Sequence, residues 1–218
     1  MIPILYLDNA ILVCVKPAGI LSQGAPEGGT DLPVLLSRQC GGQVYPIHRL
    51  DRGVGGVMVY ARTKPAAGAL SRAVQLGALK KEYLCIVSGG PEAAEGIYRD
   101  LLFHDSTRNK TFVVQRLRKG VKEASLSYRV LDTSGNRSLV RIQLHTGRTH
   151  QIRVQFASRG MPLLGDRKYG GEPAEQIALW SCHLSFPHPD TGAALSFQQS
   201  PAGTVWQNFP RADFASIG

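Results

Sequence analysis

Four consecutive residues, from His48 to Asp51, place an imidazole, a guanidinium and a carboxylate directly before a glycine-rich turn. An arginine close to a carboxylate keeps it ionised and oriented, as a nucleophile or a general base requires. Leu50 lies between Arg49 and Asp51 and can anchor the loop in the core while the charged pair faces a cleft. The glycines that follow allow another backbone or a ligand to approach closely. Asp51 is therefore the first candidate for chemistry, although an aspartate in a loop is more often a turn former.

A second candidate segment, "LHTGRTHQIRVQF", begins at Leu144. A helix is expected from Arg148 to Gly160, opened by a Thr-Gly turn whose N–H groups, together with Arg148, could meet a phosphate. On that helix His150 and Arg153 are three residues apart and share one face. An ordinary amphipathic surface helix explains the same pattern equally well.

Tyr83 is the third candidate, in the strand-like segment "KKEYLCIVSG". A tyrosine in a strand usually packs in the core or across the sheet. Its functional interpretation is an aromatic ring on which an unpaired base stacks. The histidines lack the spacing of a metal site, and no metal is expected.

The charge of the chain favours a polyanionic partner. Lysine and arginine number 25 against 16 acidic residues, which gives a formal net charge of +9 over 218 residues. Such an excess on a globular domain favours nucleic acid first, with solubility charge as the simpler alternative. The cationic residues form local clusters, among them Arg116–Lys122 and Arg148–Arg153.

The four cysteines are far apart in the sequence and have apolar neighbours, as reduced core cysteines do. This pattern predicts a reducing, cytoplasmic compartment. The apolar N-terminal stretch is interrupted by Asp8 and Asn9, so it favours two short strands around a turn over a signal peptide or a membrane span.

The remaining pattern is rich in strands. Helices are expected only after Asp31, which caps a segment with Pro33 in its first turn, over Lys64–Gly77, and in the second candidate segment. Period-two alternation marks several segments from Lys80 onward. The sequence therefore predicts an α+β fold with a mixed, mostly antiparallel sheet rather than a doubly wound one.

Taken in chain order, these segments resemble the RluA-type family of RNA pseudouridine synthases. "ILVCVKPAGILSQG" resembles the entry strand and its Lys-Pro-Gly loop, and "HRLDRGVGGVMVYART" resembles the catalytic motif. "KKEYLCIVSG" resembles the strand with the pocket tyrosine. "LHTGRTHQIRVQFASRGMPLLGDRKYGG" resembles the third motif, and "LWSCHLSFPHPDTGAALSF" the C-terminal strands. Several such segments in the right order are more specific than any one of them.

The resemblance implies an isomerase that detaches a uridine base from its ribose within ribosomal or transfer RNA, turns the base and rejoins it through carbon, without a metal or an organic cofactor. It implies that Asp51 is the catalytic carboxylate and that Arg49 reaches into the RNA. Tyr83 would stack on the flipped base, and Arg153 would form a salt bridge with the catalytic aspartate. We expect a single catalytic domain over residues 1–218, a monomer, with two subdomains flanking an active-site cleft.

The sequence departs from the family at two places. Val54 and Gly55 stand where the family usually has threonine and serine, which predicts a looser catalytic loop, and Gln155 stands where it usually has histidine. Many members also carry an N-terminal RNA-binding S4 module, for which the early first strand at Ile4 leaves no room. The loops "QGAPEGGT" and "RLRKGVKE" are expected to influence the choice of RNA.

Two other functions remain open at this point. The first is a weak or inactive relative that only binds RNA, for which Val54 and Gly55 are the support. The second is an unrelated hydrolase that uses His48 and Asp51 as base and orienting group. It would need a serine or cysteine nucleophile at a sharp glycine turn, and no G-x-S-x-G motif is present.

Overall fold

The computed structural model describes residues 1–24, 30–207 and 209, and it divides the chain into two compact units. Unit 1 consists of Met1–Lys81 and Trp180–Pro201, and unit 2 consists of Glu82–Leu179 with the described residues that follow Pro201. Residues 25–29 of the loop "QGAPEGGT" lie outside the described part of the chain. The expectation that this loop influences the choice of RNA therefore stays a prediction.

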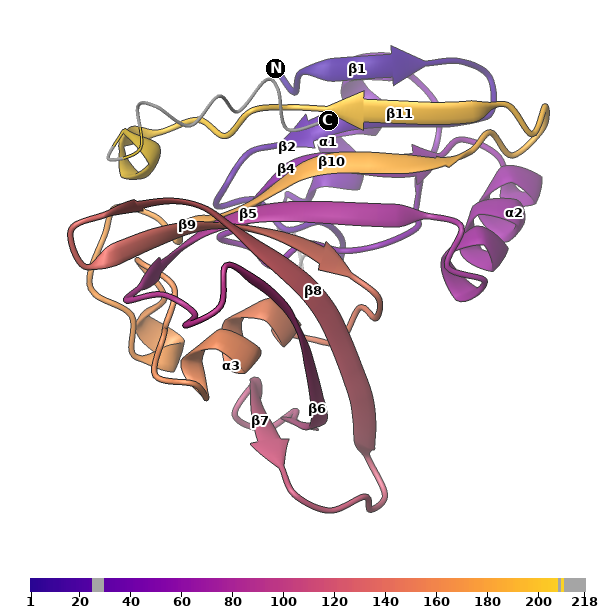
Figure 1. Ribbon diagram of the computed structural model, residues 1–218. Coiled ribbons are helices and arrows are strands. Elements are labelled where there is room, and N and C mark those ends of the chain that lie inside the picture. The colour runs from indigo at the N-terminus through magenta and orange to yellow at the C-terminus, as the bar shows by residue number, and fades with distance from the viewer. Residues whose placement is uncertain (25–29, 208, 210–218) are drawn as a thin grey trace. The chain divides into compact units, whose positions relative to one another are not determined.

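Unit 1 is built on strands that run in the order β1-β2-β4-β10, with β3 paired to β4 and β11 paired to β10 (Figure 1). Most of these pairs are antiparallel, whereas β10 runs parallel to β4. The elements are β1 (Ile4–Leu7), β2 (Ile11–Lys16), α1 (Leu32–Cys40), β3 (Tyr45–Pro46), β4 (Gly55–Ala61), α2 (Lys64–Gln75), β10 (Leu179–Pro187) and β11 (Ala194–Gln198).

Unit 2 contains an antiparallel sheet in the order β5-β9-β8-β6-β7. Its helix α3 contacts β6 and β7 (Figure 1). The elements are β5 (Lys80–Ser88), β6 (Glu95–Asp105), β7 (Lys110–Val114), β8 (Val121–Ser134), β9 (Arg137–Leu144), α3 (Gln151–Ala157) and the 3-10 helices η1 (Arg167–Tyr169) and η2 (Thr204–Trp206).

Local sequence signals explain the first helices of the chain. The Asp31 side chain accepts a hydrogen bond from Val34 N and caps α1, and Thr63 caps α2 in the same way through Ala66 N. Gly77, which follows α2, has a φ of +67° that favours glycine. Both expected helices are confirmed.

Strands are confirmed as the main component of both units, so the expectation of an α+β fold with mostly antiparallel pairing holds. The third helix is shorter than expected, because α3 covers only Gln151–Ala157. Among the described residues, no helix is long and apolar enough to cross a membrane.

The core of unit 1 packs apolar side chains of β2, β4, α2 and β10 against one another. Its fully buried members are Ile11, Val13, Val57, Val59, Ala61, Ala66, Leu70 and Leu184. In β4 all seven residues are buried, so this strand provides a rigid support immediately after the loop that holds Asp51.

The turn between β1 and β2 depends on Asp8. Its Oδ1 accepts hydrogen bonds from Ala10 N and Ile11 N, both at 2.8 Å. Its Oδ2 accepts from the Tyr6 hydroxyl at 2.9 Å and lies 2.8 Å from His188 Nε2, which comes from the turn between β10 and β11. Burial acts to raise the Asp8 pKa, but these hydrogen bonds outweigh it and lower that pKa to about 2.

We expect this depressed pKa to make stability dependent on acid. The Asp8 carboxylate stabilises the folded state above its unfolded pKa near 4, and the contribution disappears as pH falls towards 2. Asp8→Asn should therefore reduce the free energy of unfolding by about 1–2 kcal/mol at pH 7 and by much less at pH 2.5. Urea unfolding at both pH values measures this, with the exposed Asp190→Asn as control. An equal loss at both pH values would contradict it.

Candidate active site

Asp51 lies in the loop between β3 and β4, at the first position of a tight turn. Val54 N donates a hydrogen bond to Asp51 O at 3.0 Å, which closes the turn. The Asp51 side chain is half-buried, whereas Arg49 and Arg52 are exposed. The loop therefore presents one carboxylate between two arginines that solvent or a polyanion can reach.

A buried lysine holds this turn from beneath. Lys16, at the end of β2, is fully buried. Its ammonium donates hydrogen bonds to Val54 O at 2.7 Å, to Pro17 O at 3.0 Å and to Arg52 O at 3.2 Å. Three carbonyl oxygens satisfy the three donors of the ammonium, which is the condition for burying this charge. Two of them belong to the turn that begins at Asp51, so Lys16 fixes the backbone next to the carboxylate.

Electrostatics place Lys16 and Asp51 in one environment. Burial lowers the Lys16 pKa to about 8, and the negative charge of Asp51 opposes that decrease. At neutral pH the ammonium therefore stays largely protonated and supplies a fixed positive charge near the candidate carboxylate. The sequence interpretation missed Lys16. The available signal was a lysine directly before Pro17 at the start of a glycine-rich loop.

The segment before Asp51 is equally constrained. Ser22 Oγ accepts a hydrogen bond from Leu50 N at 3.0 Å and donates one to Leu50 O at 2.8 Å. The Tyr60 hydroxyl, buried in β4, donates to Ser22 O at 2.8 Å. Leu50 itself is 6% exposed, as expected for the residue that anchors the loop. Ser22 is a second residue of the "KPAGILS" segment that sequence reasoning did not single out.

A reciprocal pair of hydrogen bonds joins the same two segments further along. Gly19 N donates to Arg52 O at 2.7 Å, and Arg52 Nε donates to Gly19 O at 2.9 Å. Gly19 has a φ of +92°, a conformation that glycine adopts without strain. Residues 16–22 therefore form a cradle for residues 50–54.

His48 is unsuited to the role of a general base. Its Nε2 accepts a hydrogen bond from Val59 N at 3.3 Å, and its Nδ1 is buried without a partner among the described residues. Burial, with the positive charge of Lys81 as a smaller cause, lowers the His48 pKa to about 3. The imidazole is thus neutral and engaged by the backbone, which argues against the hydrolase alternative.

In unit 2, Arg153 forms a two-pronged ion pair with Asp166. Its Nε lies 2.7 Å from Asp166 Oδ2, and its Nη2 lies 2.7 Å from Asp166 Oδ1. The Asp166 side chain is 1% exposed, and that of Arg153 is 11% exposed. Such a planar pair fixes the orientation of the guanidinium. The predicted pairing of Arg153 with Asp51 joins residues of different units and stays a prediction.

Tyr169 connects this ion pair to the rest of the third motif. The Arg153 guanidinium lies 5.1 Å from the centre of the Tyr169 ring. The Tyr169 hydroxyl accepts a hydrogen bond from Thr111 N at 2.8 Å and lies 2.9 Å from His150 Nδ1. His150 and Arg153 therefore share a face, as their spacing predicted, and that face meets Tyr169.

The beginning of α3 differs from the expected phosphate site. His150, immediately before the helix, has a left-handed backbone with φ of +53°. Gln151 Oε1 accepts hydrogen bonds from Arg148 N and from the Thr146 hydroxyl, at 3.0 Å and 2.8 Å. The side chain of Gln151 thus accepts a hydrogen bond from the Arg148 N–H, which was expected to face a phosphate. The expected apolar side is confirmed, since Ile152 and Phe156 are buried.

Gln155 takes over a hydrogen bond that a histidine could also make. It is fully buried, and its Nε2 donates to Asp100 Oδ2 at 2.7 Å. Asp100 also forms an ion pair with Arg159 at 3.0 Å. At this departure from the expected family pattern, the side chain therefore donates to a carboxylate.

Tyr83 lies in β5 of unit 2 opposite Ile142 of β9, and it is 5% exposed. Its neighbour Glu82 belongs to the other face of the sheet, where a depression of about 510 Å³ lies over β5, β6, β8 and β9. Glu82 pairs there with Arg141, and Glu95 with Arg129. None of the predicted site residues lines this depression.

The structure therefore places Asp51 and Arg49 on one loop of unit 1, and Tyr83 and Arg153 on two elements of unit 2. Within the described ranges, no cluster of three or more metal-ligating side chains is found.

Comparison with known proteins gives a consistent picture. A family model described as RNA pseudouridylate synthase matches residues 10–158. A ribosomal large subunit pseudouridine synthase D of Vibrio cholerae is 36% identical over 89% of this chain and 65% of its own. The dual-specificity RNA pseudouridine synthase RluA of Escherichia coli is 35% identical over 89% of this chain and 91% of its own. The chain spans 63% of another relative, an uncharacterized RNA pseudouridine synthase of Synechocystis.

Solved structures share the fold. Human RNA pseudouridylate synthase domain containing 4 matches with a TM-score of 0.78 and 24% identity, over 96% of this chain and 92% of its own. Human RNA pseudouridylate synthase domain containing 1 matches with the same TM-score and 23% identity, over 92% and 84%.

The buried Lys16 gives a testable pH dependence. Its folded pKa near 8 lies below the usual 10.5, so the unfolded chain binds more protons between these values and stability rises with pH across that window. Relative to Lys16→Met, the wild type should gain about 2–3 kcal/mol of unfolding free energy between pH 7.5 and pH 10.5. Guanidinium unfolding across that range measures the difference. Parallel curves for the two proteins would contradict the burial of a charged Lys16.

Proposed function

We propose that this chain, which belongs to the RNA pseudouridylate synthase family, isomerises a specific uridine within RNA to pseudouridine. The alternative of an inactive RNA-binding relative rested on Val54 and Gly55, and both of these residues are well packed. Every residue to which the family resemblance assigns a role in the reaction is present in this chain.

In this proposal Asp51 is the catalytic carboxylate and Arg49 engages the RNA beside it. Tyr83 stacks on the flipped base, and Arg153 stabilises the charge of Asp51. The exposed Arg49 side chain supports its role. The rigid ion pair with Asp166 supports that of Arg153, since it holds the guanidinium in one orientation. Extrusion of the base is a general requirement for chemistry on a nucleotide inside a stack.

The observation that carries the proposal is the immobilisation of the Asp51 turn. Lys16 fixes the backbone after Asp51 through the carbonyls of Arg52 and Val54, and Ser22 fixes the backbone before it through the N–H and carbonyl of Leu50. A turn former needs no such support. A carboxylate that must meet one atom of a flipped nucleotide does, because a misplacement of about 1 Å can cost about 100-fold in rate.

Ribosomal or transfer RNA is the proposed substrate class. The name of one relative refers to the ribosomal large subunit, which supports ribosomal RNA, and the name of another refers to dual specificity. The net charge of +9 supports an RNA partner. We further propose a cytoplasmic monomer whose residues 1–218 act as one catalytic domain without a metal or cofactor. The four cysteines, which stand far apart in the sequence among apolar neighbours, support the reducing compartment.

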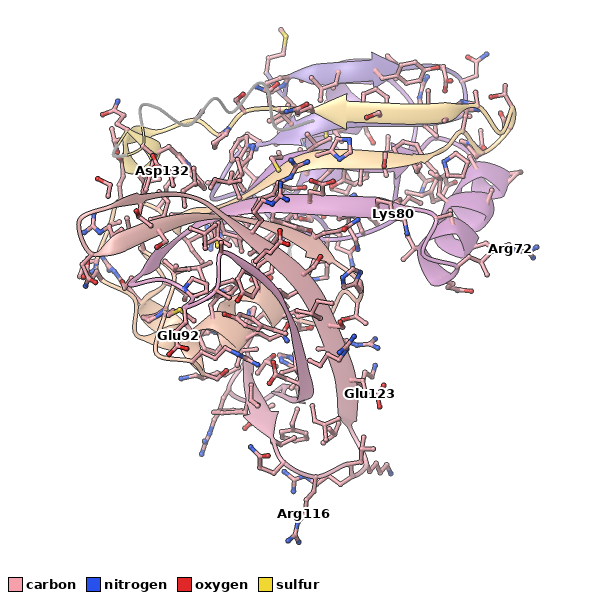
Figure 2. All side chains as sticks on the ribbon, viewed as in Figure 1. Arg72, Lys80, Glu92, Arg116, Glu123 and Asp132 are labelled. Carbon is pink, nitrogen blue, oxygen red and sulfur yellow. The ribbon has the colours of Figure 1, made fainter. Side chains whose placement is uncertain are left out.

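The loop between β7 and β8 is the proposed contact with the RNA backbone. It carries the exposed cations Arg116, Arg118 and Lys119, followed by Lys122 in β8. Arg116 points away from the tip of this loop (Figure 2). The Arg118 guanidinium lies 5.0 Å from the centre of the Phe103 ring, which gives the loop a fixed base.

Asp51→Asn tests the catalytic assignment. We expect pseudouridine formation to fall by at least about 100-fold while RNA affinity changes little, because the amide keeps the shape of the side chain and loses its charge. Carbodiimide labelling with primer extension, on RNA from cells with and without the gene, identifies the site. A labelled transcript of that site then gives the rates. Asp132→Asn, at a position in β8 that is half-buried like Asp51, is the matched control. Undiminished turnover in Asp51→Asn would overturn the assignment.

The double variant Arg116→Ala/Lys119→Ala tests the β7–β8 loop. Each lost phosphate contact removes about 0.7–0.9 from the magnitude of the slope of log K against log salt, so we expect that magnitude to decrease by about 1.4–1.8. Filter binding from low to moderate salt measures this. Arg72→Ala, an exposed arginine of α2 (Figure 2), serves as control and should leave the slope unchanged. Equal slopes for the double variant and the wild type would exclude the loop from the interface.

A further inference from the structure

The replacement of the family's serine by Gly55 has a structural counterpart in Trp180. The two residues lie opposite each other where β10 runs parallel to β4. Trp180 is 7% exposed, and its Nε1 donates a hydrogen bond to Gln199 O at 2.9 Å, which fixes the orientation of the indole. Its six-membered ring covers the position where residue 55 would carry a side chain.

Any side chain at position 55 would collide with its surroundings. A Cβ built on Gly55 would lie 2.9 Å from Trp180 Cε3, closer still to Trp180 Cζ3, and 3.1 Å from Lys16 O. A Cβ does not approach a carbon of another, non-adjacent residue to 2.9 Å, so either the indole or the start of β4 must move. The φ of Gly55 is not in the left-handed region. Glycine is therefore required at this position because a Cβ would not fit, and not because of an unusual backbone conformation.

The space that Trp180 fills adjoins the catalytic turn. Val54, the residue before Gly55, is the one whose N–H closes the turn on Asp51 O and whose carbonyl accepts from Lys16. The next residue, Gly56, packs against the Ser181 backbone with a φ of +121°. Position 55 is therefore held between Trp180 on β10 and the end of β2. Gly55 is buried and part of β4, which argues against the loosening that an added glycine predicts.

We propose that Trp180 is a positioning residue for Asp51. Its ring packs on Gly55 and fixes the end of the catalytic turn. This inference rests on the proposed function for its effect on rate. The packing itself can be tested without any activity. The indole and the glycine form one size-matched pair, so a change in either should be compensated by a change in the other.

The test uses Gly55→Ser, Trp180→Ala and the double variant, with Gly68→Ser as control, since a Cβ at Gly68 meets no atom within 4 Å. We expect Gly55→Ser to lower kcat at least about 10-fold with KM within about 3-fold, because the serine displaces the turn and not the RNA-binding surface. The double variant should regain at least about 3-fold in kcat over Gly55→Ser, since the smaller residue at 180 makes room. Gly68→Ser should behave as the wild type.

Limited proteolysis supplies a local readout that a general loss of stability would not reproduce. Trypsin can cut after the exposed Arg52 in the turn and after the exposed Arg116 in the β7–β8 loop. In Gly55→Ser and in Trp180→Ala, cleavage after Arg52 should accelerate at least about 3-fold relative to Arg116, and the double variant should show less acceleration than Gly55→Ser. If Gly55→Ser does not fold but the double variant does, the pairing is supported as well.

Three outcomes would overturn the proposal. The first is a wild-type cleavage ratio in both single variants. The second is a double variant whose kcat falls by the product of the two single effects. The third is a Gly55→Ser protein with full kcat. A wild-type protein that forms no pseudouridine in any RNA would refute the proposed function instead, and the cleavage ratios would still decide whether Trp180 positions the turn.

Discussion

The buried ammonium of Lys16 is the interaction around which the candidate site is organised. A charge this deep in a protein costs several kcal/mol unless its donors are satisfied, and here three carbonyl oxygens satisfy them. Two of these carbonyls belong to Arg52 and Val54, in the turn that begins at Asp51. The hydrogen bonds that the buried ammonium requires therefore constrain the path of that turn. The same charge partly compensates the carboxylate nearby. One lysine therefore connects the folding of unit 1 to the geometry of its proposed chemistry.

Unit 2 solves a similar problem with different groups. Asp166 is almost completely buried, and its two oxygens are matched by the fork of Arg153. The Tyr169 ring contacts that guanidinium, and its hydroxyl joins Thr111 and His150. The strained backbone of His150 is tolerated because these contacts determine its position. Asp166 and Tyr169 both lie in the sequence "GDRKYG" near the end of the third motif, and their contacts orient Arg153.

The sequence predicted what depends on short-range patterns. The cap at Asp31, the helix over Lys64–Gly77, the turn at Asp8 and the alternation of the strands are properties of neighbouring residues, and the predicted elements formed there. It failed where distant residues compete for one group. Arg148–Gly160 was expected to be a single helix, but Gln151 and His150 make contacts that delay its start. The hydrogen bonds of Lys16 could not be predicted, since the sequence does not indicate which carbonyls, 36 or 38 residues away, a buried lysine will contact.

The departures at positions 54 and 55 illustrate the same limit in the opposite direction. Judged alone, the loss of two hydroxyls and the gain of a glycine predict a floppy loop, because glycine has the most conformational freedom to lose. That reasoning treats the loop as isolated. In the folded chain Val54 holds the turn without a side-chain hydroxyl. It is 2% exposed, and its backbone supplies the contacts to Lys16 and Asp51. The freedom of Gly55 is removed by a large ring from a strand more than 120 positions later. The rigidity of this site thus depends on Gly55 and Trp180 together. A motif that contains only Gly55 therefore leads to a wrong expectation.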